Sequence, residues 1–213
     1  MKLAGTILIA LWLGAVVDFG RDVAGAAFGA KPRLNTGAVV AQVRSTHRLA
    51  ESMQRKLDRI HANAQLAHPD PTPTVLTEDE VNDYLTSGKV ELPQGVKKVK
   101  LQGRSGVVDG FVTVDFDEIS AGQRSSNPLL SIFSGVHNVN VEGDASGSGR
   151  QGKVHVRNVA IDGFDVPRVA LEYFVQKYIT PKYPNVGLDS QFPLPDKIDS
   201  ATVGYHKLTV TQR

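Results

Sequence analysis

The sequence contains no cysteine, and this absence removes several kinds of chemistry at once. None of its 213 residues can form a disulfide, ligate a metal through a thiolate or act as a cysteine nucleophile. The cysteine that carries the lipid of a bacterial lipoprotein is missing as well. The absence does not assign a compartment, because many exported bacterial proteins contain no cysteine.

An excess of one charge is also missing. The formal net charge is +2, which is too small to indicate a nucleic-acid partner, and we expect none. The charges are unevenly distributed along the chain, however. Residues 31–68 carry seven basic and two acidic side chains, whereas residues 69–213 carry 15 basic and 18 acidic ones. A basic segment therefore precedes a mildly acidic one.

Catalytic and metal-binding motifs are scarce. There is no G-x-S-x-G nucleophile elbow. His61 and His68 are seven residues apart without a carboxylate at metal-ligand spacing. Asp115 and Asp117 share one face of an expected strand, but the alternation with apolar residues directs that face toward solvent. The sequence therefore predicts no catalytic residue, no metal site and no cofactor.

The stretch GSGRQG, residues 147–152, matches the G-x-G-x-x-G spacing of a dinucleotide-binding turn. Such a turn must follow a strand and begin a helix, because the helix N-terminus holds the pyrophosphate. Here the segment that follows, KVHVRNVAI, has the alternation of a strand. The glycines are therefore predicted to form a hairpin turn between two antiparallel strands.

The N-terminus has the pattern of an export signal. Lys2 is followed by fifteen residues without charge, Leu3 to Val17, and a membrane span needs about 20. Residues 1–30 are therefore interpreted as a cleaved signal peptide, with cleavage near Ala24–Ala26, or as an anchor in the inner membrane through residues 3–17. A buried N-terminal helix is the remaining alternative. Either form of export predicts a periplasmic or extracytoplasmic protein.

Residues 31–74 are predicted to form a basic amphipathic helix followed by a proline-rich linker. The segment 37–68 has no proline and many good helix formers, and apolar residues recur every seven positions. Packing on its own domain, a weak coiled-coil stalk and contact with an anionic membrane surface are three open alternatives for this helix. The linker HPDPTPT, residues 68–74, contains three prolines.

Residues 75–213 are predicted to form an α+β domain. In LTEDEV, Thr77 and Glu80 have the spacing of a capping box, which predicts a short helix to about Thr86. Alternating valines then predict antiparallel strands. The alternation changes face between Val156 and Val159, and again between Tyr205 and Leu208, which we interpret as two β-bulges in a strongly curved sheet.

Two apolar segments interrupt the strands and give the candidate ligand groove. NPLLSIFSG, residues 127–135, is predicted to be a short helix at one mouth of the groove. DVPRVALEYFVQKYITP, residues 165–181, is predicted to be the main helix, packed on the concave face of the sheet as a dry core or as the wall of a cavity. The predicted groove residues are Leu129, Leu130, Ile132, Phe133, Leu171, Phe174, Val175 and Tyr178.

Several segments together resemble bacterial extracytoplasmic proteins of uncharacterised or lipid-related function. These are VVDFGRDVAG, LTEDEVNDYL, IDGFDVPRVALEYFV and FPLPDKIDSATVGYHKLTV. The domains of those proteins are similar to TULIP-type lipid-binding modules, and the resemblance covers residues 75–213. It implies a curved antiparallel sheet that wraps a long helix and encloses an apolar ligand channel. No functional residue carries over by position.

Two functions of different class follow. The first is a non-catalytic cell-envelope protein that binds a lipid or another hydrophobic small molecule. The alternative is a membrane-tethered scaffold that assembles, as an oligomer, through the helix at 37–68. An enzyme ranks third, behind these two functions, because the sequence shows no nucleophile, base and orienting group that would act together. The expected membrane contacts are the N-terminus and the basic helix.

Overall fold

A computed structural model describes residues 38–120 and 132–213, and for residues 38–47 it describes the backbone alone. This part of the chain forms one large antiparallel sheet of nine strands with a few helices, which confirms the predicted α+β class. The sheet does not close into a barrel. The N-terminal segment 1–30 and the greater part of NPLLSIFSG lie outside the described residues.

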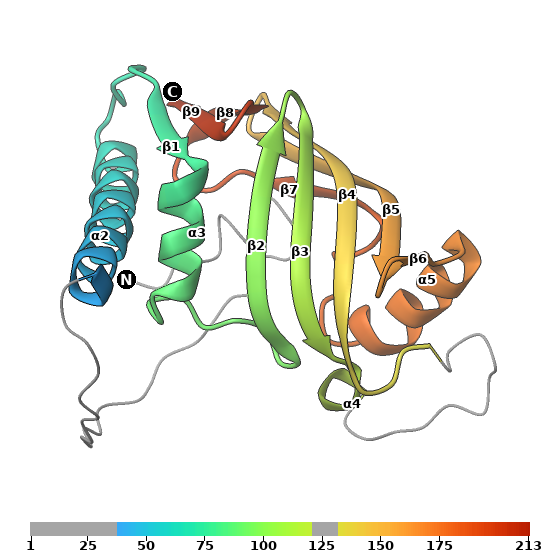
Figure 1. Ribbon diagram of the computed structural model, residues 1–213. Coiled ribbons are helices and arrows are strands. Elements are labelled where there is room, and N and C mark those ends of the chain that lie inside the picture. Colours follow the sequence, from blue (N-terminus) through green and yellow to red (C-terminus); the bar gives the residue numbers. More distant parts are fainter. Residues whose placement is uncertain (1–37, 121–131) are drawn as a thin grey trace.

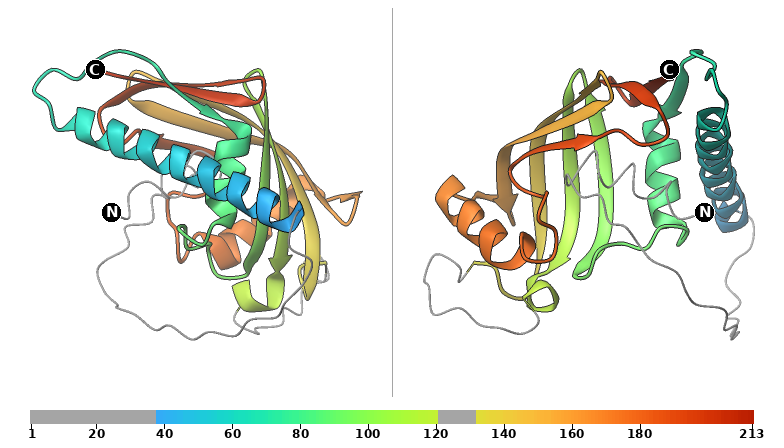
Figure 2. Two further views of the ribbon diagram at one scale, coloured as in Figure 1. Left: turned by 60° about the vertical axis from the view of Figure 1, so that its left-hand side comes forward. Right: turned by 180° about the vertical axis from the view of Figure 1, so that it is seen from behind.

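The order of the strands explains the shape of the sheet. The main path runs β1-β9-β8-β4-β3-β2, and β5 pairs with β4, β6 and β7. In Figure 1, β7 passes behind β2, β3 and β4, and Figure 2 shows it in front of them from the opposite side. The sheet therefore curls back on itself. The strands are β1 (Thr74–Thr77), β2 (Val96–Arg104), β3 (Val107–Asp115), β4 (Val136–Ser148), β5 (Gln151–Ile161), β6 (Phe164–Asp165), β7 (Asp189–Pro193), β8 (Ile198–Gly204) and β9 (Lys207–Gln212).

The stretch GSGRQG joins β4 to β5 as a hairpin, as predicted. Ser148 pairs with Gln151, and the two residues between them, Gly149 and Arg150, have φ angles of 58° and 64°. Two consecutive positive φ values are the geometry of a type I′ turn, whose twist matches that of the flanking strands. A strand follows these glycines, so the helix N-terminus that a dinucleotide turn requires is not present there.

One predicted bulge is confirmed and the other is wrong. The register between β4 and β5 shifts at Arg157, between the pairs Glu142–Asn158 and Gly143–Val156. The second break in alternation is a two-residue turn: Tyr205 and His206 connect β8 to β9, and His206 has a φ of 53°. A tight turn resets the inward face of the next strand, so it interrupts a period-two pattern just as a bulge does.

The helices are α2 (Ala38–Ala64), α3 (Glu78–Thr86), α4 (Phe116–Ile119), α5 (Arg168–Phe174) and the π-helical turn η2 (Val175–Ile179). The capping box that begins α3 is confirmed, since Thr77 and Glu80 each cap the other residue's backbone. α5 and η2 together form the helix expected within 165–181. Figure 1 shows α2 beside α3 at one end of the sheet and α5 at the other. Within the described residues, no helix is both long and apolar enough to cross a membrane.

The described side chains of the apolar stripe on α2, those from residue 48 onward, face its own domain. Ala50, Met53, Leu57, Ile60 and Ala64 are all buried. Met53, Leu57 and Ile60 belong to a cluster, called here the α2 cluster, that also contains residues of α3, β1, β8 and β9. This burial leaves the described part of the stripe unavailable as the seam of a coiled coil.

A second buried cluster, called here the aromatic cluster, lies at the end of the sheet where α5 packs. It joins apolar side chains of β3, β4 and β5 to Phe116, Phe133, Leu171, Phe174 and Tyr178. β4 and β5 run through both clusters, because Ala145 and Val154 belong to the α2 cluster and Val139 and Val159 to the aromatic cluster. The candidate site lies against both.

Candidate binding site

A cavity of about 250 Å³ lies between the sheet and the α5–η2 helix. Side chains from β2, β3, β4 and β5 form one wall, and α5, η2 and the segment that follows them form the other. Nearly all of the described side chains that line it are apolar. The strand residues are Val96, Val99, Leu101, Val112, Val114, Val139, Val141, Val154, Val156, Val159 and Ile161.

The alternation of the strands produces this apolar wall. On β3, Val112 and Val114 face the cavity, and Thr113 between them pairs with Asn138 at the outer face. Successive side chains of a strand point to opposite faces, so every second residue reaches the cavity. β-branched valines are stiff and fit a pleated surface, and they give the wall a fixed shape.

Aromatic rings close one end of the cavity. Phe133 and Phe174 stack with their ring centroids 4.3 Å apart, and Phe116 meets both rings edge-on at 5.4 and 5.5 Å. Tyr178, one turn beyond Phe174, continues the row at 5.2 Å. Offset and edge-on contacts of this kind add about 0.5–1.5 kcal/mol per pair to the burial of the rings. The rings therefore form a rigid wall.

Ion pairs fix the start of α5 against the sheet. Arg168 donates hydrogen bonds to Asp189 on β7 at 2.7 Å and to the carbonyl oxygen of Val156 on β5 at 3.3 Å. His155 on β5 also binds Asp189. The hydrogen bond with His155, and then the electrostatic attraction of His155 and of Arg168, lowers the pKa of the Asp189 carboxyl below its ordinary value. This network connects the two walls of the cavity at one edge.

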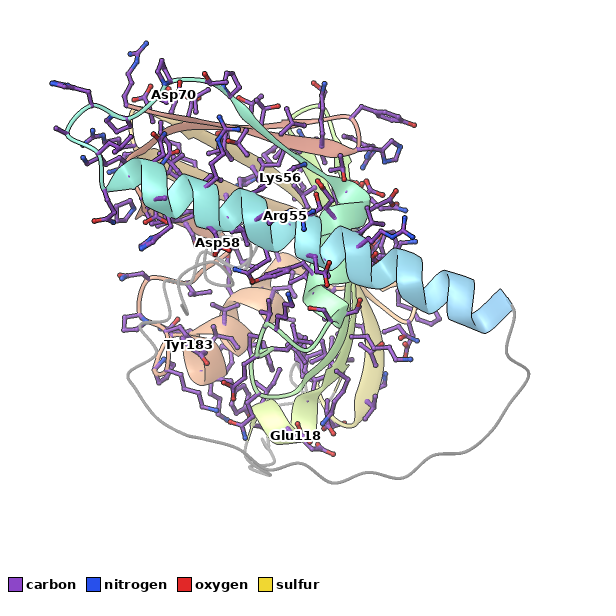
Figure 3. All side chains as sticks on the ribbon, turned by 90° about the vertical axis from the view of Figure 1, so that its left-hand side faces the viewer. Arg55, Lys56, Asp58, Asp70, Glu118 and Tyr183 are labelled. Carbon is purple, nitrogen blue, oxygen red and sulfur yellow. The ribbon has the colours of Figure 1, made fainter. Side chains whose placement is uncertain are left out.

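The cavity reaches the surface between two loops. The loop from α3 to β2 contributes Leu92, Pro93 and Gln94, and the segment after η2 contributes Lys182 and Tyr183. Gln94 and Lys182 are exposed, whereas most of the strand residues are buried or half-buried, so these two mark the mouth. Figure 3 shows Tyr183 and Glu118 on one side of α2, with Asp70 on the opposite side.

The structure brings together five of the eight predicted groove residues. Phe133, Leu171, Phe174, Val175 and Tyr178 all line the cavity. The sixth, Ile132, has a side chain that is 42% exposed and is not part of the described lining. The last two, Leu129 and Leu130, lie outside the described residues.

One position differs from the expectation for NPLLSIFSG. Phe133 was expected at the mouth of the groove, but its side chain is only 7% exposed and stacks on Phe174 inside the aromatic cluster. The described end of this segment, residues 132–135, forms a turn, and Gly135 has a φ of 76°. The turn lets Phe133 point inward while Ile132 remains exposed.

Sequence reasoning missed the strand wall and both loops at the mouth. The valines were recognised as the inward face of strands, but a dry core and a cavity wall have the same alternation. Leu92 and Pro93 lie between an expected helix and an expected strand, where apolar residues are less common than polar ones. That departure is the one signal in the sequence that could have indicated the mouth.

The other candidate sites serve structural roles in the described residues. The Asp115 side chain accepts hydrogen bonds from the amides of Asp117 and Glu118 and so caps α4. His61 forms a hydrogen bond with Asp196 at 3.1 Å, which joins α2 to the segment before β8. Among the described side chains no group of three or more is placed to hold a metal ion.

The described lining of the cavity is almost entirely apolar, includes a rigid group of aromatic rings, and has one cationic side chain, Lys182, at the mouth. No protein-family model matches the chain, and no curated protein or solved structure matches it either.

Proposed function

We propose that the chain is a non-catalytic binding protein of the cell envelope and holds a lipid or another hydrophobic small molecule in the cavity. The observation that carries this proposal is the cavity itself, about 250 Å³ in volume with an almost entirely apolar lining. Ligand pockets are concave and mostly apolar with a few polar groups, and this cavity has that composition. In this proposal the strongly curved sheet and its main helix, α5–η2, are the walls of a ligand channel.

The lining supports binding over catalysis. Its ionisable side chains, among the described residues, are Tyr178, Lys182 and Tyr183. It includes no histidine or carboxylate in the described part of the chain that could act as a general base near neutral pH. The proposal includes export through the N-terminal segment, whose pattern predicts a periplasmic or membrane-anchored form.

The scaffold alternative has less support. It was motivated by the apolar stripe of the helix at 37–68, and the described part of that stripe is buried in the α2 cluster. The exposed face of α2 carries Arg48, Arg55 and Arg59, which keeps a contact with anionic lipid compatible with the binding proposal.

The proposal is tested with the uncharged fluorophore N-phenyl-1-naphthylamine, whose emission rises in an apolar site. We expect the full chain to bind it, and Val141→Phe to weaken binding at least about tenfold because the added ring occupies cavity space. Val169→Phe is the matched control, since Val169 is 59% exposed on the outer side of α5 and is not part of the described lining.

Two results would contradict the proposal. One is a full chain that does not raise the emission of the fluorophore. The other is equal affinity in Val141→Phe and the unsubstituted chain, with both proteins folded as judged by circular dichroism. Native mass spectrometry of the gently purified chain gives an independent measurement, because a bound lipid adds its own mass.

A further inference from the structure

We propose that the ligand is an amphiphile with one alkyl chain and an anionic head, and that Lys182 holds this head at the mouth of the cavity. The inference rests on the proposed function and names the class of ligand that the cavity selects. It follows from three observations: the sign of charge at the mouth, the free donors of Lys182 and the volume available to the chain.

The side chains that line the cavity carry charge of one sign only among the described residues. Lys182 is the one charged residue among the described residues that line it, and no carboxylate accompanies it there. A cationic head would meet repulsion from this ammonium, and an uncharged head would gain no ionic hydrogen bond. An anion is the complementary partner, because charge-assisted hydrogen bonds are about twice as strong as neutral ones.

The ammonium of Lys182 has donors to spare. Toward the described residues its Nζ donates one hydrogen bond, to the carbonyl oxygen of Ile119 at the end of α4, over 3.1 Å. A lysine has three donors, so two remain for a ligand. The adjacent carboxylate on α4, that of Glu118, is bound by Lys97 at 2.5 Å. Among the described residues no carboxylate forms an ion pair with Lys182.

The bond to Ile119 also directs the ammonium. It joins the segment after η2 to α4, and Ile119 itself lines the cavity beside Phe116. The stem of Lys182 therefore lies along the cavity while its charged end is held at the exposed mouth. Tyr183 and Gln94, also at the mouth, offer a hydroxyl and an amide that can donate to the same head.

The volume of the cavity limits the apolar part of the ligand to one alkyl chain. A dry protein cavity of about 150 Å³ holds one benzene molecule, which has six carbon atoms. By the same ratio a cavity of about 250 Å³ holds about ten carbons. Two long acyl chains do not fit this space. A single chain of about ten carbons fills it, and a longer one extends past the mouth.

The experiment keeps the alkyl chain of the ligand at ten carbons and varies its head group. N-phenyl-1-naphthylamine bound to the full-length protein is competed with one of four amphiphiles at pH 7.5. These are decanoate, decyl phosphate, decanol and decyltrimethylammonium, each used below its aggregation concentration. We expect the two anions to bind about tenfold or more tightly than decanol, and the cation to bind most weakly. Preference for decanoate indicates a free fatty acid as the source of the head, and preference for decyl phosphate indicates a phosphorylated lipid.

Variants assign this preference to Lys182. We expect Lys182→Gln to reduce the advantage of the anions over decanol to less than about twofold, while the fluorophore itself binds as before. Lys182→Arg should keep the advantage, because it keeps the charge. Lys153→Gln, an exposed lysine on β5 that is not part of the described lining, is the matched control and should change nothing.

The outcomes separate this inference from the proposed function. If the full chain binds the fluorophore but decanol competes as well as decanoate, the anionic head is wrong and the apolar cavity stands. If the anions keep their advantage in Lys182→Gln, Lys182 is not their binding residue. If the fluorophore does not bind at all, both proposals fail.

Discussion

At the scale of single residues, two glycines of the β4–β5 hairpin leave room for residues of the neighbouring strands β7 and β8. A Cβ added at Gly152 would lie 2.5 Å from Cε2 of Phe192, and one at Gly147 would lie 2.9 Å from the Cβ of Ala201. Phe192 is 3% exposed, so its ring has little room to move. Two of the three glycines that resemble a cofactor motif are therefore needed for packing, and the third, Gly149, is needed for the turn.

This close approach predicts that Gly152→Ala destabilises the protein by about 1–3 kcal/mol, as overpacking of a core commonly does. Urea unfolding followed by circular dichroism measures the change. Gly187→Ala is the control, because its added Cβ would meet no described atom closer than 3.6 Å. Equal stability of the two variants would show that Phe192 can move aside.

At the scale of elements, the carboxylate of Glu80 fastens α2 to α3. It accepts hydrogen bonds from Ser52 at 2.7 Å and Lys56 at 2.6 Å, both on α2, and from the amide of Thr77 at 2.9 Å. Lys56 also donates to the carbonyl oxygen of Val75 on β1. Burial acts to raise the pKa of Glu80, but these hydrogen bonds outweigh it and lower the pKa from 4.5 to about 2. Lys56 lies on the face of α2 seen in Figure 3.

The lowered pKa predicts how stability depends on acid. The folded state binds this proton less tightly than the unfolded chain, so the stabilisation is complete above pH 4.5 and is lost as the pH falls toward 2. At pH 7, Glu80→Gln should cost about 1–3 kcal/mol, and the cost should vanish near pH 2. Urea unfolding at a series of pH values measures both.

The matched control is Glu51→Gln, which removes an exposed carboxylate from α2, the helix that Glu80 fastens to α3. Its stability should follow that of the unsubstituted chain at every pH. A Glu80→Gln variant that loses stability in acid as steeply as the unsubstituted chain would contradict the role of this carboxylate.

The elements that the sequence predicted well are those whose signals are local. The capping box at Thr77 needs two residues three positions apart, and the hairpin at Gly149 needs two consecutive positive φ values. The turn at Tyr205 was misread because a turn and a bulge break the alternation in the same way. The burial of Phe133 against Phe174 depends on residues about 40 positions apart, so no local pattern contains it.

The cavity could not be distinguished from a dry core for the same reason. Its described walls come from four strands, four helical segments and three loops, and each wall alone has the pattern of an ordinary buried face. Whether facing side chains meet or leave a gap depends on the curl of the sheet, and on how Arg168 and Asp189 hold α5 against it. The sequence did not indicate Lys182 as a binding residue, because a lysine near the end of a helix is common on protein surfaces.

At the scale of the whole molecule, the long strands β4 and β5 make the two buried clusters interdependent. Both strands contribute side chains to each cluster, so neither cluster can open without exposing strands that the other needs. Figure 1 shows α2 and α5 at opposite ends of the sheet that contains these strands. We therefore expect the described part of the chain to unfold in one cooperative transition.

A substitution in α2 tests this coupling from one end of the molecule to the other. Leu57 is 3% exposed in the α2 cluster, and Leu57→Ala should lower the free energy of unfolding by about 2–5 kcal/mol. If unfolding is cooperative, the most protected amides of α5 and β3 lose the same free energy as those of α2, as measured by hydrogen exchange. Leu66→Ala, at a side chain that is 52% exposed just beyond α2, should change neither region by more than about 0.5 kcal/mol. Loss of protection confined to α2 and α3 would show instead that this end opens alone and that the cavity keeps its walls without it.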